Sequence, residues 1–448
     1  MELAIFAASL NLAALSQLDS HTEILAGSIS EWLPRALLFV TVMSIAMAAT
    51  GLYNSRQFLT TAGLLTRTVV AAAGGTLVMS IISRVVPDLF IEHNVLMVGA
   101  LIVAATSFGW HYLLDKIACE NTFKRRVIVF GAGRRATSLM QLPARRDHLG
   151  LHIVGFIPSA GDESSAVVGD QCIELRTALH EHCIAEGVSE VVVAMDDSRS
   201  GLAFDAFLEC RLHGIVVTDL TAFLERETGK VRVDLAHPGW MIFASGFCRN
   251  SLQVRLERVF DLLASLVLVT LTCPVMVLAA LAIKLEDGFG ARVLYRQMRV
   301  GERGQTFPLL KFRSMREDAE KDGCPRWATA NDNRVTRVGR VMRKLRIDEL
   351  PQILNVLAGE MSLVGPRPER PEFVLQLNTR IPFYRERHSI KPGITGWAQL
   401  CYPYGSNETD AAEKLQYDLF YVKNRTLLFY LAILLQTVEV VLWGKGAR

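Results

Sequence analysis

The chain has 448 residues, of which 50% are hydrophobic and 21% are charged, and its mean hydropathy is +0.26. It is long enough for two or three domains and too apolar for an ordinary soluble enzyme, so we expect membrane segments. The net charge is +3, and we expect no nucleic-acid partner. The eight cysteines form no C-x-x-C pair and have no histidine at zinc spacing, which predicts a reduced cytoplasmic chain without disulfides or a structural metal.

Four apolar runs occupy the N-terminal region, at residues 3–18, 36–53, 69–86 and 95–114. Each is close to the roughly 20 residues that a bilayer span needs. Buried core helices are the alternative, but four runs in succession with little polar sequence between them favour transmembrane helices. The first run is the shortest and contains Asn11. A signal peptide is disfavoured because Met1 and Glu2 supply no basic start. We therefore expect a four-helix transmembrane region at residues 1–118.

Charged residues between the runs predict the orientation of these helices. Acidic residues dominate the first and third loops, namely Asp19, Glu23, Glu31, Asp88 and Glu92. Basic residues lie in the second loop and after the fourth run, namely Arg56, Arg67, Lys116, Lys124, Arg125 and Arg126. Because positively charged loops stay in the cytoplasm, the chain enters the cytoplasm after the fourth run. With four spans, the N-terminus is also inside.

An apolar strand followed by a glycine-rich turn begins the next region, with the sequence RRVIVFGAGRRA at residues 125–136. Further strands are predicted at residues 152–157, 190–194 and 214–218, separated by helical patterns, so we expect a parallel α/β domain at residues 119–250. The G-x-G-x-x-A turn is typical of a dinucleotide site. No convincing ribose-binding acid follows the second strand, and we assign no cofactor-binding residue here.

One more apolar run, at residues 259–285, contains Pro274. Taken alone it would be a transmembrane helix broken by the proline. Arg258 precedes the run and Lys284 lies at its end, while a cytoplasmic domain and a basic region lie on its two sides. Both ends should therefore face the cytoplasm. A helix bent over residues 265–274 that dips into the bilayer and returns satisfies this, because proline removes a backbone donor and frees a carbonyl at the bend.

A strongly basic stretch leads into a pair of adjacent carboxylates. Residues 296–347 contain fourteen Lys and Arg against six Asp and Glu, a net charge of +8, whereas the rest of the chain sums to −5. A solvated basic face is the alternative, but polyanion binding fits better a run that ends at Asp348 and Glu349. A carboxylate held among cations can act as a nucleophile toward phosphorus or as a ligand of a hard cation.

Apolar residues recur at helical spacing around this pair and predict a helix at residues 350–358, with Pro351 in its first turn. Asp348 and Glu349 then lie at the helix N-terminus, where free N–H groups favour anions. An N-capping role is the alternative for Asp348. Downstream, two prolines flank Arg367, which suits bidentate contact with a phosphate.

Three ordered strings resemble those of the bacterial sugar transferases called monotopic phosphoglycosyl transferases. They are YRQMRVGERGQTFPLLKFRSM at residues 295–315, RIDELPQILNVLAGEMSLVGPRPE at 346–369 and KPGITGWAQL at 391–400. The similarity covers residues 256–448, and the segment 402–424 is most similar to the exopolysaccharide branch, including the exosortase-associated transferases. The resemblance implies transfer of a sugar-1-phosphate from a UDP-sugar to polyprenyl (undecaprenyl) phosphate, with a magnesium ion, as the initiating membrane step of exopolysaccharide biosynthesis.

The resemblance also implies roles for individual residues in a catalytic domain at residues 251–448. Asp348 is the nucleophile that forms a phospho-sugar intermediate, and Glu349 helps to bind the magnesium ion. Lys311 and Arg313 join the catalytic site, whereas substrate phosphate is bound by Arg343, Arg367 and Asp418. The same resemblance implies the re-entrant hairpin at residues 259–285 and a Rossmann-like regulatory or scaffolding module at residues 119–250.

Two departures from the family pattern bear on the site. Arg346 and Ile347 replace a small or hydroxyl residue and a leucine before the dyad, which adds charge and leaves the dyad intact. Tyr430 stands where many relatives carry an aspartate, which bears on the docking of a C-terminal helix expected at residues 427–443. That helix lies at the headgroup boundary, spans the membrane or packs on the catalytic domain. Apolar and basic residues mix at 373–390, which suits a membrane interface, with ordinary core and rim as the alternative.

The expected fold is therefore a membrane α/β protein in three parts: a transmembrane bundle, a Rossmann-like parallel α/β domain and a mainly helical catalytic domain with a re-entrant hairpin. We expect it in the bacterial inner membrane, with the catalytic domain on the cytoplasmic face. The expected partners are a UDP-sugar, polyprenyl phosphate and the lipid bilayer, and a homodimer is left open. The competing hypotheses are a membrane-anchored nucleotide-binding regulator and a nucleotide-sugar oxidoreductase. The sequence does not identify the sugar.

Overall fold

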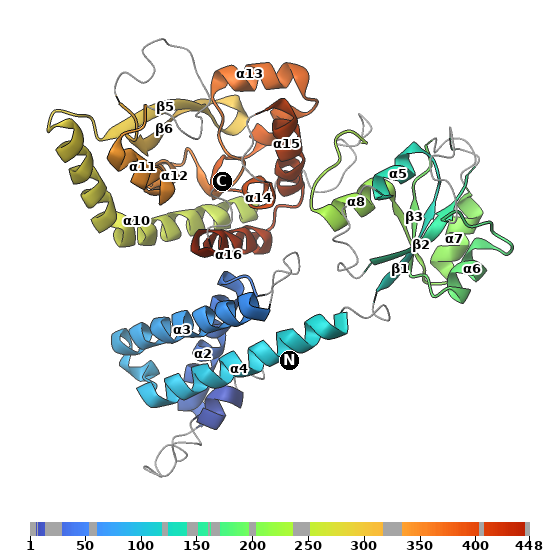
Figure 1. Ribbon diagram of the computed structural model, residues 1–448, viewed down its shortest axis with the longest axis horizontal. Coiled ribbons are helices and arrows are strands. Elements are labelled where there is room, and N and C mark those ends of the chain that lie inside the picture. The colour runs from blue at the N-terminus through green and yellow to red at the C-terminus, as the bar shows by residue number, and fades with distance from the viewer. Residues whose placement is uncertain are drawn as a thin grey trace. The chain divides into compact units, whose positions relative to one another are not determined.

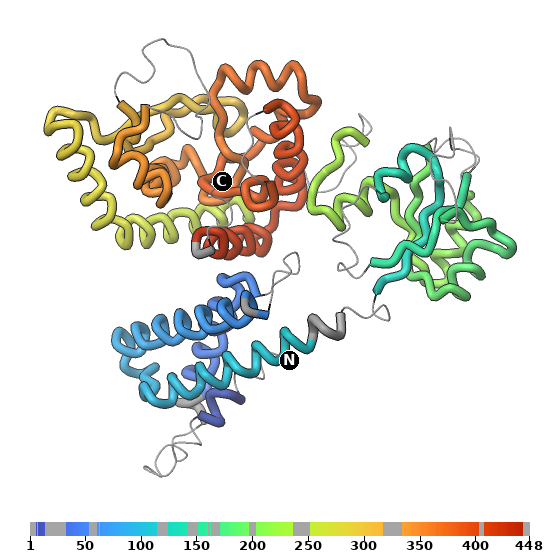
Figure 2. Tube along the Cα trace, in the orientation of Figure 1, coloured from blue at the N-terminus to red at the C-terminus, as the bar shows by residue number. Residues whose placement is uncertain are grey.

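Two compact units make up the protein, residues 1–224 and 225–448. The computed structural model describes residues 6, 8–13, 29–52, 61–118, 124–140, 151–159, 162, 171–196, 203–235, 251–316, 334–402 and 407–443. Figure 1 labels the helices and strands, and Figure 2 traces the chain through them. The predicted domain boundaries after residues 118 and 250 stay predictions.

Long apolar helices form the described part of the N-terminal region. They are α2 (Ile29–Ala49), α3 (Thr61–Val85) and α4 (His93–Ala118), with the 3-10 turn η1 (Pro87–Leu89) between α3 and α4. Within the described residues, Gly63–Val85 and His93–Leu113 are long and apolar enough to cross a membrane, and Leu33–Ala49 is apolar but shorter. The expected first span, 3–18, lies largely outside the described residues, although 8–13 are helical.

The position of Arg67 corrects the prediction of a loop between the second and third runs. Arg67 lies inside α3, which begins at Thr61 rather than near residue 69, and its side chain is buried. Its guanidinium donates a hydrogen bond of 3.0 Å to the carbonyl of Thr50, just after α2. A cation at that position satisfies a carbonyl that the helix end leaves without a partner. Arg67 therefore stabilises the packing of two helices and says nothing about their orientation in the membrane.

The α/β region contains a four-stranded parallel sheet of order β2-β1-β3-β4. The strands are β1 (Arg125–Phe130), β2 (Leu151–Ile157), β3 (Glu190–Val193) and β4 (Val216–Asp219), with α5 (Arg134–Met140), α6 (Leu179–Ala185), α7 (Phe204–Leu212) and α8 (Leu220–Thr228). Ile128, Val191 and Phe207 are buried in a common core. The predicted parallel α/β arrangement is confirmed, and the strands begin within two residues of the predicted positions.

The glycine-rich turn after β1 is filled by the protein's own carboxylates. Asp162 accepts a hydrogen bond of 2.9 Å from the amide of Ala132. Asp196, which follows β3, accepts hydrogen bonds from the amides of Arg134 and Arg135 at 2.9 and 2.8 Å. These amides are the donors that a bound pyrophosphate would need. In this structure, two aspartates take the place of such an anion.

The C-terminal unit is mainly helical (Figure 1) and carries two small sheets. β5 (Leu294–Val300) and β6 (Thr306–Phe312) form an antiparallel hairpin around η4 (Glu302–Gly304), and β7 (Ser362–Val364) pairs in parallel with β8 (Gly393–Thr395). Its other elements are α10 (Ser251–Asp287), α11 (Arg337–Lys344), η5 (Ile347–Glu349), α12 (Gln352–Ala358), α13 (Pro371–Arg380), η6 (Tyr384–Ser389), α14 (Trp397–Cys401), α15 (Glu408–Lys423) and α16 (Leu427–Trp443). The core lies around Val356, Leu363, Trp397 and Tyr421, and α16 has the predicted bounds.

Residues 225–235, upstream of α10, belong to this unit and contact its helices. Glu225 forms an ion pair of 2.7 Å with Lys423 on α15. The indole N–H of Trp397 donates a hydrogen bond of 2.7 Å to the carbonyl of Gly229. Buried polar groups of this kind are costly to leave without partners. The contacts of the C-terminal unit therefore extend upstream of residue 251, the predicted start of the catalytic domain.

The helix α10 contacts the C-terminal unit near both of its ends. It is a single helix of 37 residues that contains Pro274, and Figure 1 shows that it is bent. Asp261 near its start and Ile283 near its end are buried. Between them, the exposed side chains are mostly leucine and valine, including Leu262, Leu263, Leu266, Val267, Leu271, Val275 and Leu278. The middle of α10 is thus an apolar surface, whereas both arms pack on the same unit.

The carboxylate pair lies in a short turn that is separate from the helix predicted at 350–358. α12 begins at Gln352 with Pro351 as its N-cap, while Asp348 and Glu349 belong to the 3-10 turn η5. Proline has no N–H, so the ladder of helical hydrogen bonds is interrupted between the two elements. The dyad is therefore presented by a tight turn ahead of the helix. The helix ends, as predicted, at Gly359, whose φ is 89°.

Candidate active site

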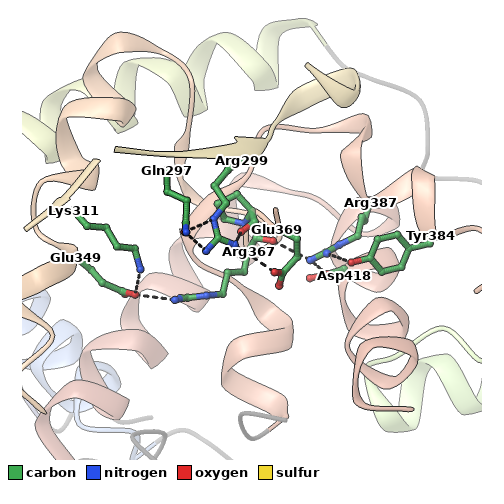
Figure 3. A network of polar contacts seen from close by, with 10 residues as sticks. Gln297, Arg299, Lys311, Glu349, Arg367, Glu369, Tyr384, Arg387 and Asp418 are labelled. Atoms are coloured by element: carbon green, nitrogen blue, oxygen red, sulfur yellow. Dashed lines mark hydrogen bonds and ion pairs between the residues drawn. The ribbon is translucent and has the colours of Figure 1, made fainter. Parts of the chain in front are cut away.

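Glu349 lies between two cations from different parts of the chain (Figure 3). Its Oε1 accepts a hydrogen bond of 3.0 Å from Lys311 Nζ on β6 and another of 2.8 Å from Arg367 Nη2, three residues after β7. The Glu349 side chain is 14% exposed, and the two cations are 19% and 28% exposed. Three segments therefore meet at one carboxylate oxygen.

The side chain of Asn355 fixes the turn that carries Glu349 against β6. Its Oδ1 accepts a hydrogen bond of 3.0 Å from the amide of Leu310, and its Nδ2 donates one of 2.9 Å to the carbonyl of Pro308. Asn355 is buried on α12, directly after the carboxylate pair. A buried amide with both ends bonded has one low-energy orientation. It therefore sets the distance between η5 and the strand that presents Lys311.

The two cations keep Glu349 ionised. Burial alone would raise the pKa of this carboxyl, but the charges of Arg367 and Lys311, with their hydrogen bonds, outweigh it and hold the pKa well below its ordinary value. Burial lowers the pKa of Lys311, and repulsion from Arg367 adds to this, while attraction to Glu349 opposes it. A permanently charged carboxylate suits a ligand of a hard cation and does not suit a proton donor.

Asp348 lies next to the cluster formed by Lys311, Glu349 and Arg367. The electrostatic environment of its carboxyl differs from that of Glu349. The Asp348 side chain is buried, and its Oδ1 has no hydrogen-bond partner among the described residues. Burial, followed by the negative charge of Glu349, raises the pKa of the Asp348 carboxyl, while Lys311, Arg343 and Arg346 oppose the shift. A buried carboxylate oxygen without a donor is poorly stabilised and therefore nucleophilic when ionised.

A small pocket opens beside the cluster and contains two site residues that we did not predict. Its lining is Arg299, Leu309, Lys311, Gln352, Arg367, Pro368 and Gly393. Arg299 and Lys311 share one face of the β5–β6 hairpin, because Arg299 pairs with Phe307 and successive residues on a strand alternate between faces. The alternation of side chains between the two faces of this hairpin is the signal that could have identified Arg299 as a site residue. Gln352 carried no comparable signal. The pocket walls supply three cations, which suits phosphate oxygens.

The loop that carries Arg367 is held from behind by two further arginines (Figure 3). Arg299 donates a hydrogen bond of 3.0 Å to the carbonyl of Pro368, and Arg387 donates one of 3.1 Å to the carbonyl of Arg367. Arg387 is buried and forms an ion pair of 2.7 Å with Asp418 on α15. Asp418, predicted to bind phosphate, thus faces Arg387 and is not among the residues that line the pocket.

Arg313 and Arg343 also have protein partners in this structure. Arg313 pairs with Asp287 at the end of α10 at 2.5 Å, and Arg343 Nε donates a hydrogen bond of 3.0 Å to Ser314 Oγ. The structure therefore brings Lys311, Glu349 and Arg367 together, with Asp348 beside them. It places the other three predicted residues in supporting contacts around that centre.

The two departures from the family pattern have local explanations. Arg346 precedes η5 in the left-handed conformation, with a φ of 58°. Its side chain makes no capping hydrogen bond, and its charge opposes the rise of the Asp348 pKa. Tyr430 on α16 is fully buried, and its hydroxyl donates a hydrogen bond of 2.6 Å to Asp261 on α10. The tyrosine therefore docks the C-terminal helix on α10.

Comparisons with known proteins place the chain in a class. The family model described as "Bacterial sugar transferase" matches residues 252–444. The "UDP-glucose:undecaprenyl-phosphate glucose-1-phosphate transferase" of Caulobacter vibrioides is 44% identical over 195 residues, which are 43% of this chain and 71% of that protein. The chain therefore belongs to the bacterial sugar transferase family. The resemblance predicted from three strings of the sequence is confirmed.

Two further relatives extend the similarity upstream of the catalytic region. The "UDP-N-acetylgalactosamine-undecaprenyl-phosphate N-acetylgalactosaminephosphotransferase" of Aeromonas hydrophila is 38% identical over 278 residues, 62% of this chain and 64% of that protein. The "Undecaprenyl-phosphate glucose phosphotransferase" of Komagataeibacter xylinus is 31% identical over 350 residues, 75% of this chain and 62% of that protein. The chain thus matches a little under two thirds of each. The sugars in the relatives' names differ, so similarity does not identify the sugar here.

Proposed function

We propose that this protein transfers a sugar-1-phosphate from a UDP-sugar to undecaprenyl phosphate, giving a lipid-linked diphosphate sugar and UMP. The observation that carries the proposal is the adjacent pair of Asp348, which is buried, and Glu349, which is 14% exposed and ionised. One carboxylate is held by two cations, while its neighbour has an oxygen without a partner among the described residues. The family and the basic pocket support the same reaction class.

The chemistry proceeds in two displacements. A carboxylate oxygen of Asp348 attacks the sugar-bearing phosphorus, the bond from that phosphorus to the UMP oxygen breaks, and UMP leaves with the electron pair. An oxygen of undecaprenyl phosphate then attacks the same phosphorus and breaks its bond to Asp348, which regenerates the carboxylate. Arg367 and Lys311 stabilise the negative charge that gathers on the phosphate oxygens. Each displacement transfers the sugar-bearing phosphoryl group intact, and no oxidant or reductant is needed.

The donor set fits a magnesium ion held by Glu349. No group of three or more His, Cys, Asp or Glu side chains is arranged to bind a metal within the ranges that the structure describes. Magnesium, however, is typically bound by one or two carboxylates together with substrate phosphates and water. Glu349 is an ionised oxygen donor whose partners Lys311 and Arg367 line the pocket. When bound there, the ion would neutralise phosphate charge.

The apolar middle of α10 supports insertion into the cytoplasmic leaflet as a re-entrant hairpin. A helix of 37 residues is about 55 Å long when straight and would cross a bilayer. Its two arms, however, pack on the same unit, because Asp261 bonds to β7 and Asp287 bonds to Arg313. A spanning helix would place those contacts on opposite sides of the membrane. We therefore propose an inner-membrane protein whose catalytic unit lies on the cytoplasmic face.

Thiol labelling tests the hairpin. Leu252 and Phe289 are 63% and 78% exposed at the two ends of α10. Single cysteines at these positions, in a cysteine-free background, should both resist an impermeant reagent in intact spheroplasts and both react after permeabilisation. Labelling of one end from outside would mean that α10 spans the bilayer.

The competing oxidoreductase receives no support from the glycine-rich turn, because Asp162 and Asp196 already accept its amide hydrogens. Turnover tests the transferase directly. The purified full chain should release UMP from at least one member of a UDP-sugar panel, when undecaprenyl phosphate and magnesium are present. UDP-glucose and UDP-N-acetylgalactosamine are the first members to try. No UMP from any member, with a folded protein, would reject the transferase, and stoichiometric bound dinucleotide would favour the oxidoreductase.

A further inference from the structure

A cation of α10 holds the far end of the helix that follows the carboxylate pair. Arg258 donates hydrogen bonds of 2.6 and 2.9 Å to the carbonyls of Val356 and Leu357 in the last turn of α12. Carbonyls at a helix C-terminus have no partner inside the helix, and a cation there also favours the helix dipole. Because η5 and α12 are consecutive, a change at this contact moves the segment that presents Glu349.

A carboxylate one turn further along α10 holds the strand that leads to Arg367. Asp261 is 3% exposed, and its Oδ1 accepts hydrogen bonds of 2.8 Å from the amide of Leu363 and 3.1 Å from Ser362 Oγ, both on β7. The hydroxyl of Tyr430 donates a third bond to the same oxygen. Arg367 follows β7 by three residues. The strand is therefore fixed to α10 immediately before the loop that carries this arginine.

Packing alone does not explain why these two residues are charged. Burial of a charged side chain such as that of Asp261 costs free energy, and an apolar side chain of similar volume often packs at least as well. Arg258 is half-buried. Arg258 instead bonds the backbone of α12, which follows Glu349, and Asp261 bonds the amide of Leu363 and the hydroxyl of Ser362 on β7, which precedes Arg367. The contact between Arg367 Nη2 and Glu349 Oε1 is 2.8 Å long.

We infer that Arg258 and Asp261 are positioning residues, through which the membrane-facing helix α10 sets the alignment of Glu349 with Arg367. The inference rests on the proposed function, because the aligned groups are those assigned to phosphate and metal binding. It goes further by placing part of the control of turnover in α10, outside the pocket. Displacing a substrate-positioning group by about 1 Å lowers rates roughly 10²-fold in enzymes generally.

Kinetics of Asp261 variants test the inference. Asp261→Ala removes the shared acceptor, so kcat should fall roughly 10²-fold. The KM for the UDP-sugar should change much less, because the pocket cations remain. Asp261→Asn keeps an acceptor oxygen and should restore most of kcat. The matched control is Glu257→Gln, one turn earlier on the same buried face, because the polar partners of Glu257 are Gln253 and Arg425, which lie outside both segments. Equal kcat for Asp261→Ala and Glu257→Gln, or no rescue by Asp261→Asn, would overturn the inference.

Hydrogen exchange gives a second readout that needs no turnover. Asp261→Ala should speed exchange at residues 362–367 and leave α11 unchanged, because Glu286 at the other end of α10 caps α11 through the amides of Arg337 and Val338. Unchanged exchange at 362–367 would refute the positioning role even if the transferase assay succeeds. Conversely, if the protein has no transferase activity but Asp261→Ala still speeds exchange at this peptide, the proposed function is rejected. The structural coupling between α10 and β7 then still holds.

A milder variant keeps the test valid if Asp261→Ala does not fold. Ser362→Ala removes one donor to Asp261 and leaves the sequence of α10 intact. Relative to the unmutated protein, it should lower kcat by less than about 10²-fold, with KM unchanged, and should speed exchange at the same peptide. Normal kcat together with normal exchange would count against the inference.

Discussion

Two regions of this protein look alike as phosphate sites in the sequence, and the structure separates them. The glycine-rich turn after β1 has the amides of an anion site, but Asp162 and Asp196 accept their hydrogens. The pocket beside Glu349 has cations in its wall, and one of its neighbours, Asp348, has an oxygen that no described residue bonds. In the turn, the described carboxylates thus accept the amide hydrogens, whereas in the pocket three cations line the wall and two of them, Lys311 and Arg367, share the single carboxylate of Glu349.

The difference teaches that a phosphate site is recognised by what its donors already bind. An anion entering the glycine-rich turn would meet two carboxylates and would have to displace them, which Coulomb repulsion opposes. An anion entering the pocket meets Arg299, Lys311 and Arg367 in its walls. A glycine pattern reports that the backbone can approach a ligand and does not report whether it does.

Replacing one aspartate in each region should give the largest difference in turnover between the two regions. Asp348→Asn removes the proposed nucleophile, and turnover should fall roughly 10⁴-fold or more. Asn caps helices and turns about as well as Asp, so the protein should stay folded. Asp196→Asn in the glycine-rich turn should leave turnover unchanged. UMP release at saturating substrates measures both, and near-normal turnover in folded Asp348→Asn would remove the distinction between the regions.

An arginine in each region should give the next largest contrast. Arg367→Lys keeps the charge but loses the planar fork that bonds Glu349 and is proposed to bond a substrate phosphate as well, so kcat/KM should fall roughly 10²-fold. Arg134→Lys, at the exposed start of α5, is the matched control and should have no effect. A strong effect of Arg134→Lys would show that the α/β domain takes part in turnover.

Filling the glycine-rich turn should affect stability and leave catalysis intact. A Cβ at Gly133 would clash with the Asp196 carboxylate, which would have to release the amides that it accepts. Gly133→Ala should therefore lower the stability of the α/β domain by about 1–3 kcal/mol. Thermal unfolding of the protein and hydrogen exchange at β1 and β3 both measure this loss of stability. Loss of kcat in the folded variant, at a temperature well below unfolding, is the contrary outcome.

Acid should destabilise the C-terminal unit through His388. Burial, with the charge of Arg387, lowers the pKa of His388 to about 3 from its ordinary 6.5. The fold holds the neutral form, so the unfolded chain binds the proton more readily below pH 6.5. Stability present above pH 6.5 is therefore lost as the pH falls toward 3, by about 1.4 kcal/mol per pH unit at most. His388→Asn should flatten this part of the denaturation profile, and an unchanged slope would assign it to other groups.

Local patterns in the sequence predicted the elements that depend on neighbouring residues. The strand positions, the bounds of α16 and the stop at Gly359 follow from periodicity and turn chemistry over a few residues. The start of α12 was predicted less well, because the missing N–H of Pro351 separates the dyad turn from the helix. Lys311, Glu349 and Arg367 were selected from family strings, and the structure then placed them in contact.

Contacts between distant residues were beyond the reach of the sequence. Asp418 reads as a site residue by its motif, but its partner Arg387 lies 31 positions upstream, and their pairing requires the fold. Arg67 reads as a loop charge, yet it bonds a carbonyl 17 residues away inside a helix pair. In both cases a buried charge found a partner through packing, which no local pattern encodes.

The most direct test of the covalent route is a burst experiment without the lipid acceptor. The full chain, mixed with a UDP-sugar that it turns over, should release one UMP per active site. Its intact mass should rise by one phospho-sugar, located on Asp348 by peptide mapping. Undecaprenyl phosphate should then discharge the adduct, and Asp348→Asn should give neither the burst nor the adduct. Release of UMP that begins only when undecaprenyl phosphate is added, with no adduct at any time, would contradict the route and indicate direct transfer between the two substrates.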